Sequence, residues 1–349
     1  MAQTKADIRS FYWRDDTLHI LDQRRLPALE TWLILDSAAQ VVDAIRDMCV
    51  RGAPAIGIVA AYGVVLSART QTGKPMALQQ RAILADMDSL AQARPTAVNL
   101  RWALQRMRYI LEQHSPPSVA ALLAEARAIH RQDIEQNQRM AAAGSALIVP
   151  ESVVLTHCNT GSLATGAHGT ALGVIRNAWR AGSIRRIFAT ETRPWLQGAR
   201  LTAWELARDG IPATLIIDAA AAVTMQREHV GWIIVGADRI AANGDVANKI
   251  GTYALAVMAR HHGARFMVVA PSSSVDMRIP DGGHIPIEYR DHEEIWKAAG
   301  LESPLPGIDA RNPAFDITPA ELVDMLVTER GIIEKPGREN MAKMFENVG

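Results

Sequence analysis

The segment VVLTHCNTGSLATGAHGTALG, residues 153–173, decides the fold of the larger part of this chain. It begins as an apolar, β-branched run, passes through polar residues into a glycine-rich turn, and continues as an alanine-rich stretch of helical character. A strand followed by a tight turn and a helix is the repeating unit of a parallel sheet covered by helices. We therefore expect an α/β domain around this segment.

The same alternation recurs through the rest of the chain. Short runs rich in strand-forming residues stand at residues 153–155, 186–189, 214–217, 232–235 and 265–269. Stretches of helical character separate them, and strands that are apolar throughout are typical of a sheet buried on both faces. The pattern predicts that residues 146–349 form a doubly wound α/β domain, with a terminal helix after about residue 335.

The first 145 residues have a different, mainly helical pattern. A small β-hairpin is predicted at Phe11–Trp13 and Leu18–Leu21. Ser37 can cap a helix that runs to about Val50. The apolar stretch Ala55–Ala68 is about 14 residues long, too short to span a bilayer, and predicts a buried helix. Amphipathic helices are expected near residues 76–92, 97–113 and 118–145.

Composition excludes several classes of protein. The 349 residues suit two domains, and the 37 basic residues balance 37 acidic ones, which does not favour nucleic acid or an anionic membrane as a partner. The two cysteines form no CxxC pair, so neither a disulfide framework nor a structural zinc site is expected. No metal-binding motif such as HExxH is present, and the N-terminus has no secretory signal. We expect a cytoplasmic protein.

Polar side chains follow every predicted strand of the second domain, at the point where the strand ends. In an open parallel sheet, ligands bind beyond the carboxyl ends of the strands. The residues at these exits are His157-Cys158-Asn159, Glu191-Thr192-Arg193, Asp218, Gly236-Ala237-Asp238-Arg239 and Pro271-Ser272. The sequence therefore predicts a ligand site at this edge.

Cys158 and Asp238 are the candidate reactive groups among these residues. A thiol at a strand exit that faces a helix N-terminus can have a lowered pKa, but a lone cysteine is often an inert, buried residue. A carboxyl at the end of an apolar strand can have a raised pKa and act as an acid near neutrality. Asp238 can equally pair with Arg239 or cap the next element, and Asp218 holds the same kind of position.

Several segments offer groups that suit an anionic ligand. The glycine-rich turn after Cys158 can hold a phosphate on backbone amides, although it matches neither the Walker nor the GxGxxG pattern. Asn248-Lys249 is expected at the opening of a helix. Arg51-Gly52-Ala53 and Arg94 offer guanidinium groups beside backbone amides. Each of these alone also fits tight packing or an ordinary surface residue.

Taken together, these motifs resemble the methylthioribose-1-phosphate isomerases, in the family that includes the regulatory subunits of translation initiation factor 2B. The resemblance covers nearly the whole chain. It runs in order through RGAPAIG (51–57), ARPTAVNLRWA (93–103), THCNTGSLATG (156–166), ETRPWLQGARLTAWEL (191–206), VGADRIAANGDVANKIGTY (235–253) and NPAFDITPAELV (312–323). The second block and the Cys–Asp pair are similar to the isomerase branch.

The resemblance implies a Rossmann-like doubly wound second domain after a smaller helical domain, a homodimer, a place in methionine salvage and no cofactor or metal. It implies Cys158 and Asp238 as the catalytic pair. The implied substrate contacts are Arg51, Gly52, Ala53, Arg94, Gln197, Asn248 and Lys249. Two other readings remain open: an isomerase of ribose 1,5-bisphosphate or 5-deoxyribose 1-phosphate, and a non-catalytic subunit that senses a sugar phosphate.

Overall fold

The computed structural model describes residues 8–95, 97–298, 300 and 307–345, and the chain divides into two compact units. The first unit holds the chain up to Arg139 together with Thr160–Gly169. The second holds Met140–Asn159 and the chain from Thr170 onward. The glycine-rich loop therefore leaves the second unit at Thr160, packs within the first unit, and returns at Thr170.

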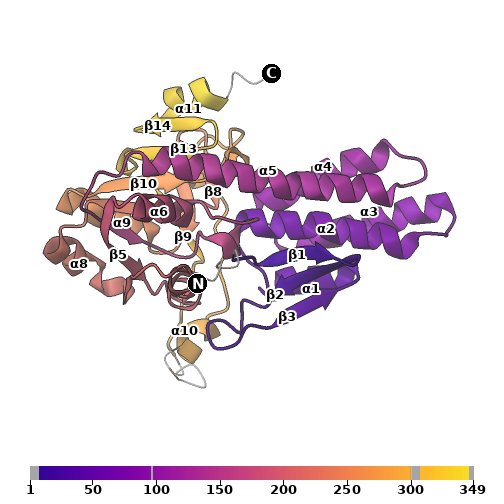
Figure 1. The fold of residues 1–349 in the computed structure, drawn as a ribbon, viewed down its shortest axis with the longest axis horizontal. Coiled ribbons are helices and arrows are strands. Elements are labelled where there is room, and N and C mark those ends of the chain that lie inside the picture. Colours follow the sequence, from indigo (N-terminus) through magenta and orange to yellow (C-terminus); the bar gives the residue numbers. More distant parts are fainter. Residues whose placement is uncertain (1–7, 96, 299, 301–306, 346–349) are drawn as a thin grey trace, which may run out of the picture. The chain divides into compact units, whose positions relative to one another are not determined.

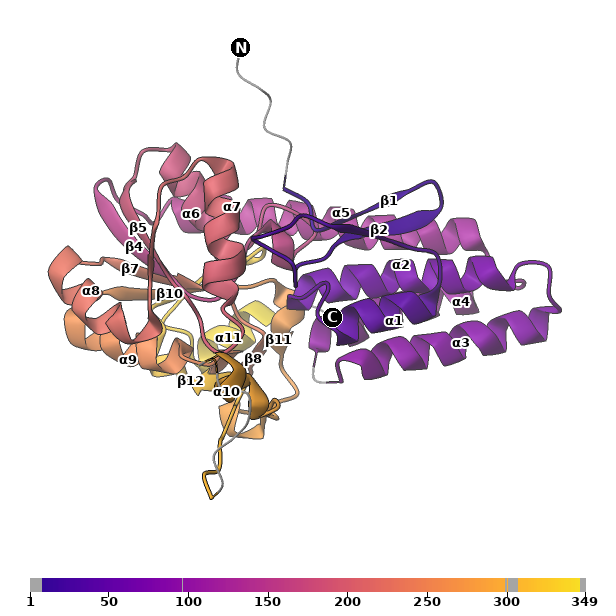
Figure 2. The same cartoon turned by 90° about the horizontal axis from the view of Figure 1, so that it is seen from below.

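The first unit combines a small antiparallel sheet with a group of helices (Figure 1). Strands β1 (Phe11–Arg14) and β2 (Thr17–Leu21) form the predicted hairpin, and β3 (Trp32–Leu35) adds a strand that was not predicted. The helices are α1 (Ala38–Arg46), α2 (Ala53–Gln71), α3 (Met76–Ala93), α4 (Val98–Glu112) and α5 (Val119–Ser145), the last of which continues into the second unit. Figure 2 shows α2 between the sheet strands and α3.

Helix α2 is the core of the first unit. It is long and apolar enough to span a membrane, but 83% of its apolar stretch is buried inside the protein, as in the core helix of a globular domain. Every residue from Ala55 to Ala68 is buried, which confirms the predicted buried helix. The prediction for α1 was wrong in detail, because α1 ends at Arg46 and the Ser37 side chain makes no capping hydrogen bond.

The second unit is built on a sheet with the strand order β14-β13-β10-β7-β4-β5-β6, seven strands in the described chain. These strands are β4 (Ser152–Thr156), β5 (Ile184–Thr190), β6 (Thr214–Ile216), β7 (Trp232–Val235), β10 (Arg265–Val269), β13 (Met325–Thr328) and β14 (Gly331–Glu334). All neighbouring pairs run parallel except β13 and β14. The five predicted strands and the parallel sheet are confirmed.

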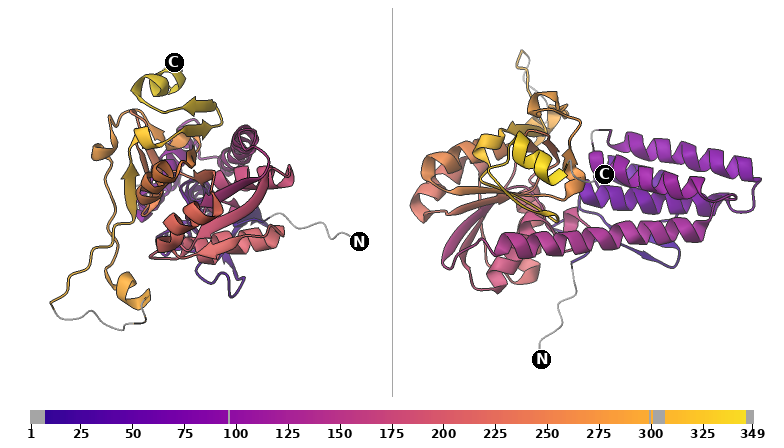
Figure 3. Two further views of the ribbon diagram at one scale, coloured as in Figure 1. Left: turned by 90° about the vertical axis from the view of Figure 1, so that its left-hand side faces the viewer. Right: turned by 90° about the horizontal axis from the view of Figure 1, so that it is seen from above.

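Helices cover both faces of this sheet, as a doubly wound fold requires. The helices are α6 (Ala171–Arg180), α7 (Ala203–Asp209), α8 (Ala221–Glu228), α9 (Thr252–His262) and α11 (Arg338–Phe345), the predicted terminal helix. Along β7, Trp232 and Ile234 pack in a core with α6 and α7, whereas Ile233 and Val235 pack in a core with α8, α9 and α11. Figure 3 shows α11 together with β13 and β14 at one edge.

A second, smaller sheet with the strand order β11-β8-β9-β12 was not predicted. Its strands are β8 (Arg239–Ala241), β9 (Val246–Lys249), β11 (Val275–Asp276) and β12 (Phe315–Thr318); a short helix α10 spans Glu293–Ala298. This sheet corrects one expectation: Asn248 and Lys249 lie at the end of β9 and do not open helix α9, which begins at Thr252. The pairing of β9 with β12, not a helix, therefore places these two residues.

Candidate active site

The order of the strands creates a switch point between β4 and β7. From β4 the chain moves outward through β5 to β6, then returns to β7 on the other side of β4 and moves outward through β10 and β13. Ligands in such sheets bind beyond the carboxyl ends of the two strands at the switch. Cys158 follows β4 and Asp238 follows β7. The two candidate reactive residues therefore lie beyond the carboxyl ends of the two strands that flank the switch point.

Asp238 is half-buried, and its backbone amide donates to the carbonyl of Ala247 at 2.9 Å. The next element is strand β8, which pairs antiparallel with β9, so Asp238 does not cap a helix. Because β9 ends in Asn248 and Lys249, this pairing brings those two residues beside the exit of β7.

Asn248 and Lys249 are both buried. The Asn248 side chain donates to Thr252 Oγ1 at 3.0 Å. Lys249 Nζ donates to the carbonyl of Ala314 at 2.9 Å and lies 4.4 Å from the centre of the Phe315 ring. A buried ammonium on an aromatic face is poorly hydrated, so it interacts strongly with an anion.

Asp218 has a structural role that its position in the sequence did not reveal. Its two carboxylate oxygens accept the backbone amides of Thr192 and Arg193, at 2.8 and 2.7 Å. The carboxylate therefore holds the turn at the exit of β5. This separates Asp218 from Asp238, which the sequence left equivalent.

Gln197 is placed at the exit of β5 by its neighbour Gly198. A Cβ atom on Gly198 would stand 1.7 Å from the carbonyl oxygen of Thr190, so only glycine permits this approach. Gln197 is 5% exposed, and its buried Oε1 has no hydrogen-bond partner. A buried acceptor without a partner is costly, which makes Gln197 a candidate contact for a ligand hydroxyl.

Asp316 was not among the predicted site residues. It lies on β12 and accepts the backbone amides of Gly251 and Tyr253, at 2.7 and 3.1 Å, at the start of α9. Burial raises the pKa of Asp316 to about 6, although these amides and the Lys249 charge oppose the rise. No sequence pattern pointed to Asp316, because β12 comes near α9 only through the second sheet.

The remaining predicted residues lie in the first unit. Arg51 is buried and precedes α2, whose first residue is Ala53. Gly52 has φ +101°, and a Cβ there would stand 2.5 Å from the carbonyl oxygen of Ala164 in the glycine-rich loop. The first turn of α2 and this loop are therefore in direct contact. Arg94 is half-buried and is the residue that follows α3.

Two side chains of α5 hold the glycine-rich loop, and neither was predicted. His130 Nε2 contacts the carbonyl of Gly166 at 3.0 Å, and Asp133 Oδ2 accepts the Gly166 amide at 2.7 Å. Burial lowers the pKa of His130, so the imidazole is neutral and donates from Nε2. Side chains of α5 thus hold the loop at both the backbone carbonyl and the backbone amide of Gly166.

The two cysteines differ in environment. Cys49 is buried in the core of the first unit, and burial raises its pKa to about 11. Cys158 is partly exposed. Among the residues described, no three His, Cys, Asp or Glu side chains are grouped so that they could hold a metal ion.

The sequence of this chain matches the model of a known protein family. The model of the initiation factor 2 subunit family matches residues 49–335. The chain belongs to this family.

Within the family, curated relatives that are 53–57% identical to this chain carry one name. Methylthioribose-1-phosphate isomerase of Thioalkalivibrio sulfidiphilus is 56% identical over 340 residues, which cover 97% of each chain. The protein of that name from Pseudomonas aeruginosa is 56% identical over 345 residues, covering 97% of this chain and 96% of the relative. The recognition of the family from the ordered motifs is confirmed.

Solved structures of the family have the same fold. The crystal structure of 5-methylthioribose 1-phosphate isomerase from Pyrococcus horikoshii matches with a TM-score of 0.90 at 43% identity, covering 97% of this chain and 96% of the other. A structure described as translation initiation factor eIF-2B, subunit delta, from A. fulgidus matches with a TM-score of 0.85 at 39% identity, covering 97% and 99%. The α/β fold class is confirmed.

Proposed function

We propose that this protein is an aldose–ketose isomerase that converts 5-methylthioribose 1-phosphate to 5-methylthioribulose 1-phosphate in methionine salvage. The names of full-length relatives at 53–57% identity support the reaction. The observation that carries the proposal is the position of Cys158 and Asp238 at the carboxyl ends of β4 and β7. A reactive thiol and a proton donor at one switch point suit chemistry on a single small substrate.

The proposed first step is ring opening with Asp238 as the acid. The anomeric oxygen of the substrate carries phosphate, so the ring cannot open to an aldehyde as a free sugar does. Protonation of the ring oxygen by Asp238 lets the bond between C1 and that oxygen break, and C1 becomes electron-deficient. The Asp238→Asn variant should fold and lose most turnover.

The second step moves hydrogen from C2 to C1, and two routes balance. In one, the Cys158 thiolate removes the C2 proton, the electron pair forms an enol, and C1 is then protonated. In the other, the C2 hydrogen moves to C1 as hydride. In both, the hydroxyl on C2 becomes the ketone and releases its proton. A reaction in D₂O separates the routes, because only the enol route places solvent deuterium at C1.

We propose that the other predicted residues bind the substrate. Arg51 with the amides of Gly52 and Ala53, Arg94 and Lys249 suit the phosphate, because guanidinium, ammonium and backbone amides all donate to anionic oxygen. The unpartnered Oε1 of Gln197 and the amide of Asn248 suit sugar hydroxyls. Conversion of Arg51, Arg94, Gln197, Asn248 and Lys249 singly to alanine should raise KM more than it lowers kcat.

Two alternatives are tested with the same preparation. Ribose 1,5-bisphosphate and 5-deoxyribose 1-phosphate differ from the proposed substrate at C5, so ketose formation from each compound identifies the preferred group. The structural match to the protein from A. fulgidus named as an initiation factor subunit supports the non-catalytic alternative. Absence of ketose from all three compounds would contradict the enzymatic proposal and favour that alternative.

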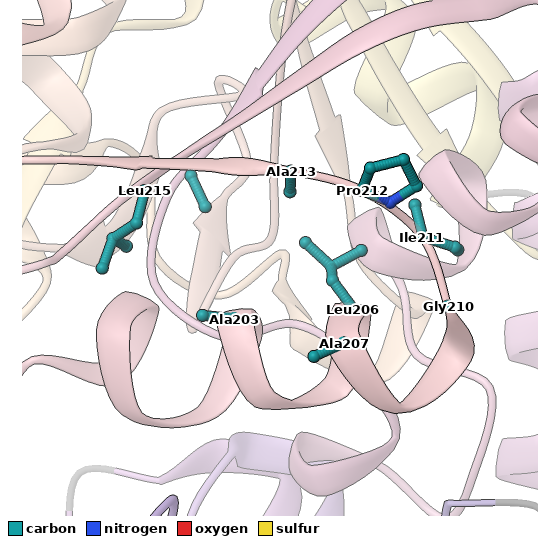
Figure 4. A pocket seen from close by; sticks show the side chains of 9 residues that line it. Ala203, Leu206, Ala207, Gly210, Ile211, Pro212, Ala213 and Leu215 are labelled. Carbon is teal, nitrogen blue, oxygen red and sulfur yellow. The ribbon is translucent and has the colours of Figure 1, made fainter.

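We also propose a cytoplasmic homodimer that uses no cofactor. Strand β6 is the edge of the large sheet, and Leu215 and Ile217 are 46% and 59% exposed. An apolar groove of about 480 Å³ lies beside it, lined by Ala203 and Leu206 of α7 and by Pro212 (Figure 4). Residues 211–217, IPATLII, contain no charge to protect this edge, so a second copy of the chain is the expected cover.

Sedimentation velocity tests the dimer. Leu215→Lys should shift the protein from dimer to monomer, whereas Leu78→Lys, at a leucine of α3 that is 55% exposed, should leave it a dimer. A wild-type monomer at micromolar concentration would contradict the proposal.

A further inference from the structure

Cys158 has a backbone conformation that its surroundings must maintain. Its φ is +64°, in the left-handed region, which costs a non-glycine residue about 1–3 kcal/mol. Both adjoining peptide groups are held by threonine hydroxyls. The Cys158 amide donates to Thr192 Oγ1 at 2.8 Å, and Thr202 Oγ1 donates to the Cys158 carbonyl at 2.5 Å.

The first of these contacts is the end of a longer chain of hydrogen bonds. Thr192 Oγ1 lies 3.0 Å from Thr190 Oγ1, which lies 2.7 Å from Nδ1 of His157. Nε2 of His157 lies 2.9 Å from the carbonyl oxygen of Ile250. His157, Thr190 and Thr192 are all buried, so this chain runs inside the second unit from Ile250 to Cys158.

The chemistry of the two ends determines which atoms of His157 and Thr190 donate. The Ile250 carbonyl only accepts, so His157 donates from Nε2 and, as a neutral imidazole, accepts at Nδ1. Thr190 must therefore donate to Nδ1, which leaves its oxygen as the acceptor for Thr192. Thr192 donates to Thr190, whose Oγ1 and carbonyl oxygen lie 3.0 and 3.3 Å from Thr192 Oγ1, and the Thr192 oxygen accepts from the Cys158 amide, which only donates.

The neutral state of His157 fits its surroundings. Burial lowers the pKa of His157, and the nearby Lys249 charge acts in the same direction, although the Asp218 carboxylate and the Ile250 carbonyl oppose it. The series of hydrogen bonds ends at Ile250, the residue that follows β9, and β9 is the strand that pairs with β8. It therefore joins the exit of β4 to the end of β9.

We propose that His157, Thr190 and Thr192 are positioning residues for the isomerase reaction, because their ordered hydrogen bonds hold Cys158 in the left-handed conformation that turnover requires. This inference rests on the proposed function of Cys158. None of the three side chains needs to touch the substrate. Their removal should lower kcat with little change in KM, since the binding residues keep their places.

Steady-state kinetics of three variants test the proposal. Thr192→Val is nearly isosteric and removes the acceptor of the Cys158 amide, and it should lower kcat at least about tenfold, the value expected for one lost hydrogen bond that matters in the transition state. Thr192→Ser restores the hydroxyl and should stay within about threefold of wild type. Thr156→Val is the matched control, because Thr156 is buried on β4 and its hydroxyl donates to the Ile234 carbonyl, away from Cys158.

Amide exchange gives a readout that does not depend on activity. The chain has two cysteines, so protein labelled with ¹⁵N-cysteine has two backbone amide signals, and Cys49 is the internal reference. Thr192→Val should speed exchange of the Cys158 amide about tenfold or more and leave Cys49 unchanged. Thr156→Val should change neither signal.

The outcomes separate this inference from the proposed function. If wild type converts the substrate but Thr192→Val matches Thr156→Val in kcat and in amide exchange, the positioning role is refuted and the function stands. If wild type has no activity, the function is refuted, and the positioning role for catalysis falls with it whatever the exchange data show.

Discussion

Replacement of Arg176 by methionine should destabilise the second unit by about 3–5 kcal/mol, because it removes the cation of a buried ion cluster and leaves its carboxylates. Arg176 donates to Glu205 at 2.8 Å and to Asp209 at 2.6 Å. The side chains of Arg176 and Glu205 are 3% and 0% exposed. Burial alone would lower the pKa of Arg176, but the two carboxylates raise it above its usual value. Without the guanidinium, Glu205 is left as a buried charge.

A double-mutant cycle shows whether the orphaned charge causes the loss. Glu205 also accepts the side-chain amide of Asn159 at 2.8 Å, and glutamine keeps an oxygen for that contact. The double variant Arg176→Met, Glu205→Gln lacks the fully buried charge of Glu205 and keeps only that of Asp209, whose side chain is 18% exposed. It should therefore be more stable than Arg176→Met alone, by about 2 kcal/mol.

Urea unfolding followed by circular dichroism measures these differences. Arg186→Met is the matched control, since Arg186 pairs with Glu228 at the surface, and it should cost less than about 1 kcal/mol. The reasoning is refuted if Arg176→Met stays within about 1 kcal/mol of wild type, or if the double variant is less stable than Arg176→Met.

Three further perturbations test separate parts of the structure. The pKa of Asp316, about 6, is above its unfolded value of 3.8, so its stabilising contribution is complete below about pH 4 and is lost as pH rises through about 6. The unfolding free energy of wild type relative to Asp316→Asn should thus fall by about 2 kcal/mol between pH 4 and 7.5, and a constant difference would contradict this. Iodoacetamide at pH 7.5 should modify Cys158 and abolish activity while Cys49, with its pKa of about 11, stays unmodified by mass spectrometry; modification of Cys49 first would be evidence against the assigned environments. Gly198→Ala should cost at least about 2 kcal/mol and reduce kcat/KM, because its Cβ would overlap the Thr190 carbonyl. Gly231→Ala, whose nearest contact would be 3.9 Å, should cost less, and equal losses would show that the close approach is unimportant.

The sequence predicted β4, β5, β6, β7 and β10 because each of these strands carries its own signal, whereas β13 and β14 were not predicted. The run at 232–235 is apolar throughout and the run at 265–269 is apolar after Arg265, and β7 and β10 have those bounds. The small sheet was missed because β8, β9 and β11 are two to four residues long and alternate little in hydropathy. Their pairing, rather than their composition, makes them strands.

The site was predictable in part for the same reason. Cys158 and Asp238 follow strong strands, so their place at the sheet edge could be inferred from order alone. The supporting residues could not, because their partners are distant in the sequence. The Thr192 hydroxyl meets an amide 34 residues away, and Asp316 accepts an amide 65 residues away. The sequence alone did not distinguish Asp218 from Asp238, because the backbone amides that Asp218 accepts come from a distant segment.

Turnover of 5-methylthioribose 1-phosphate by wild type, Asp238→Asn and Cys158→Ser tests the central claim most directly. Ketose formation can be followed by ¹³C NMR as the C2 carbonyl signal appears. The account predicts conversion by wild type and loss of most of kcat in each variant, with both variants folded by circular dichroism. Wild-type kcat in either variant would contradict the claim that Cys158 and Asp238 together carry the chemistry.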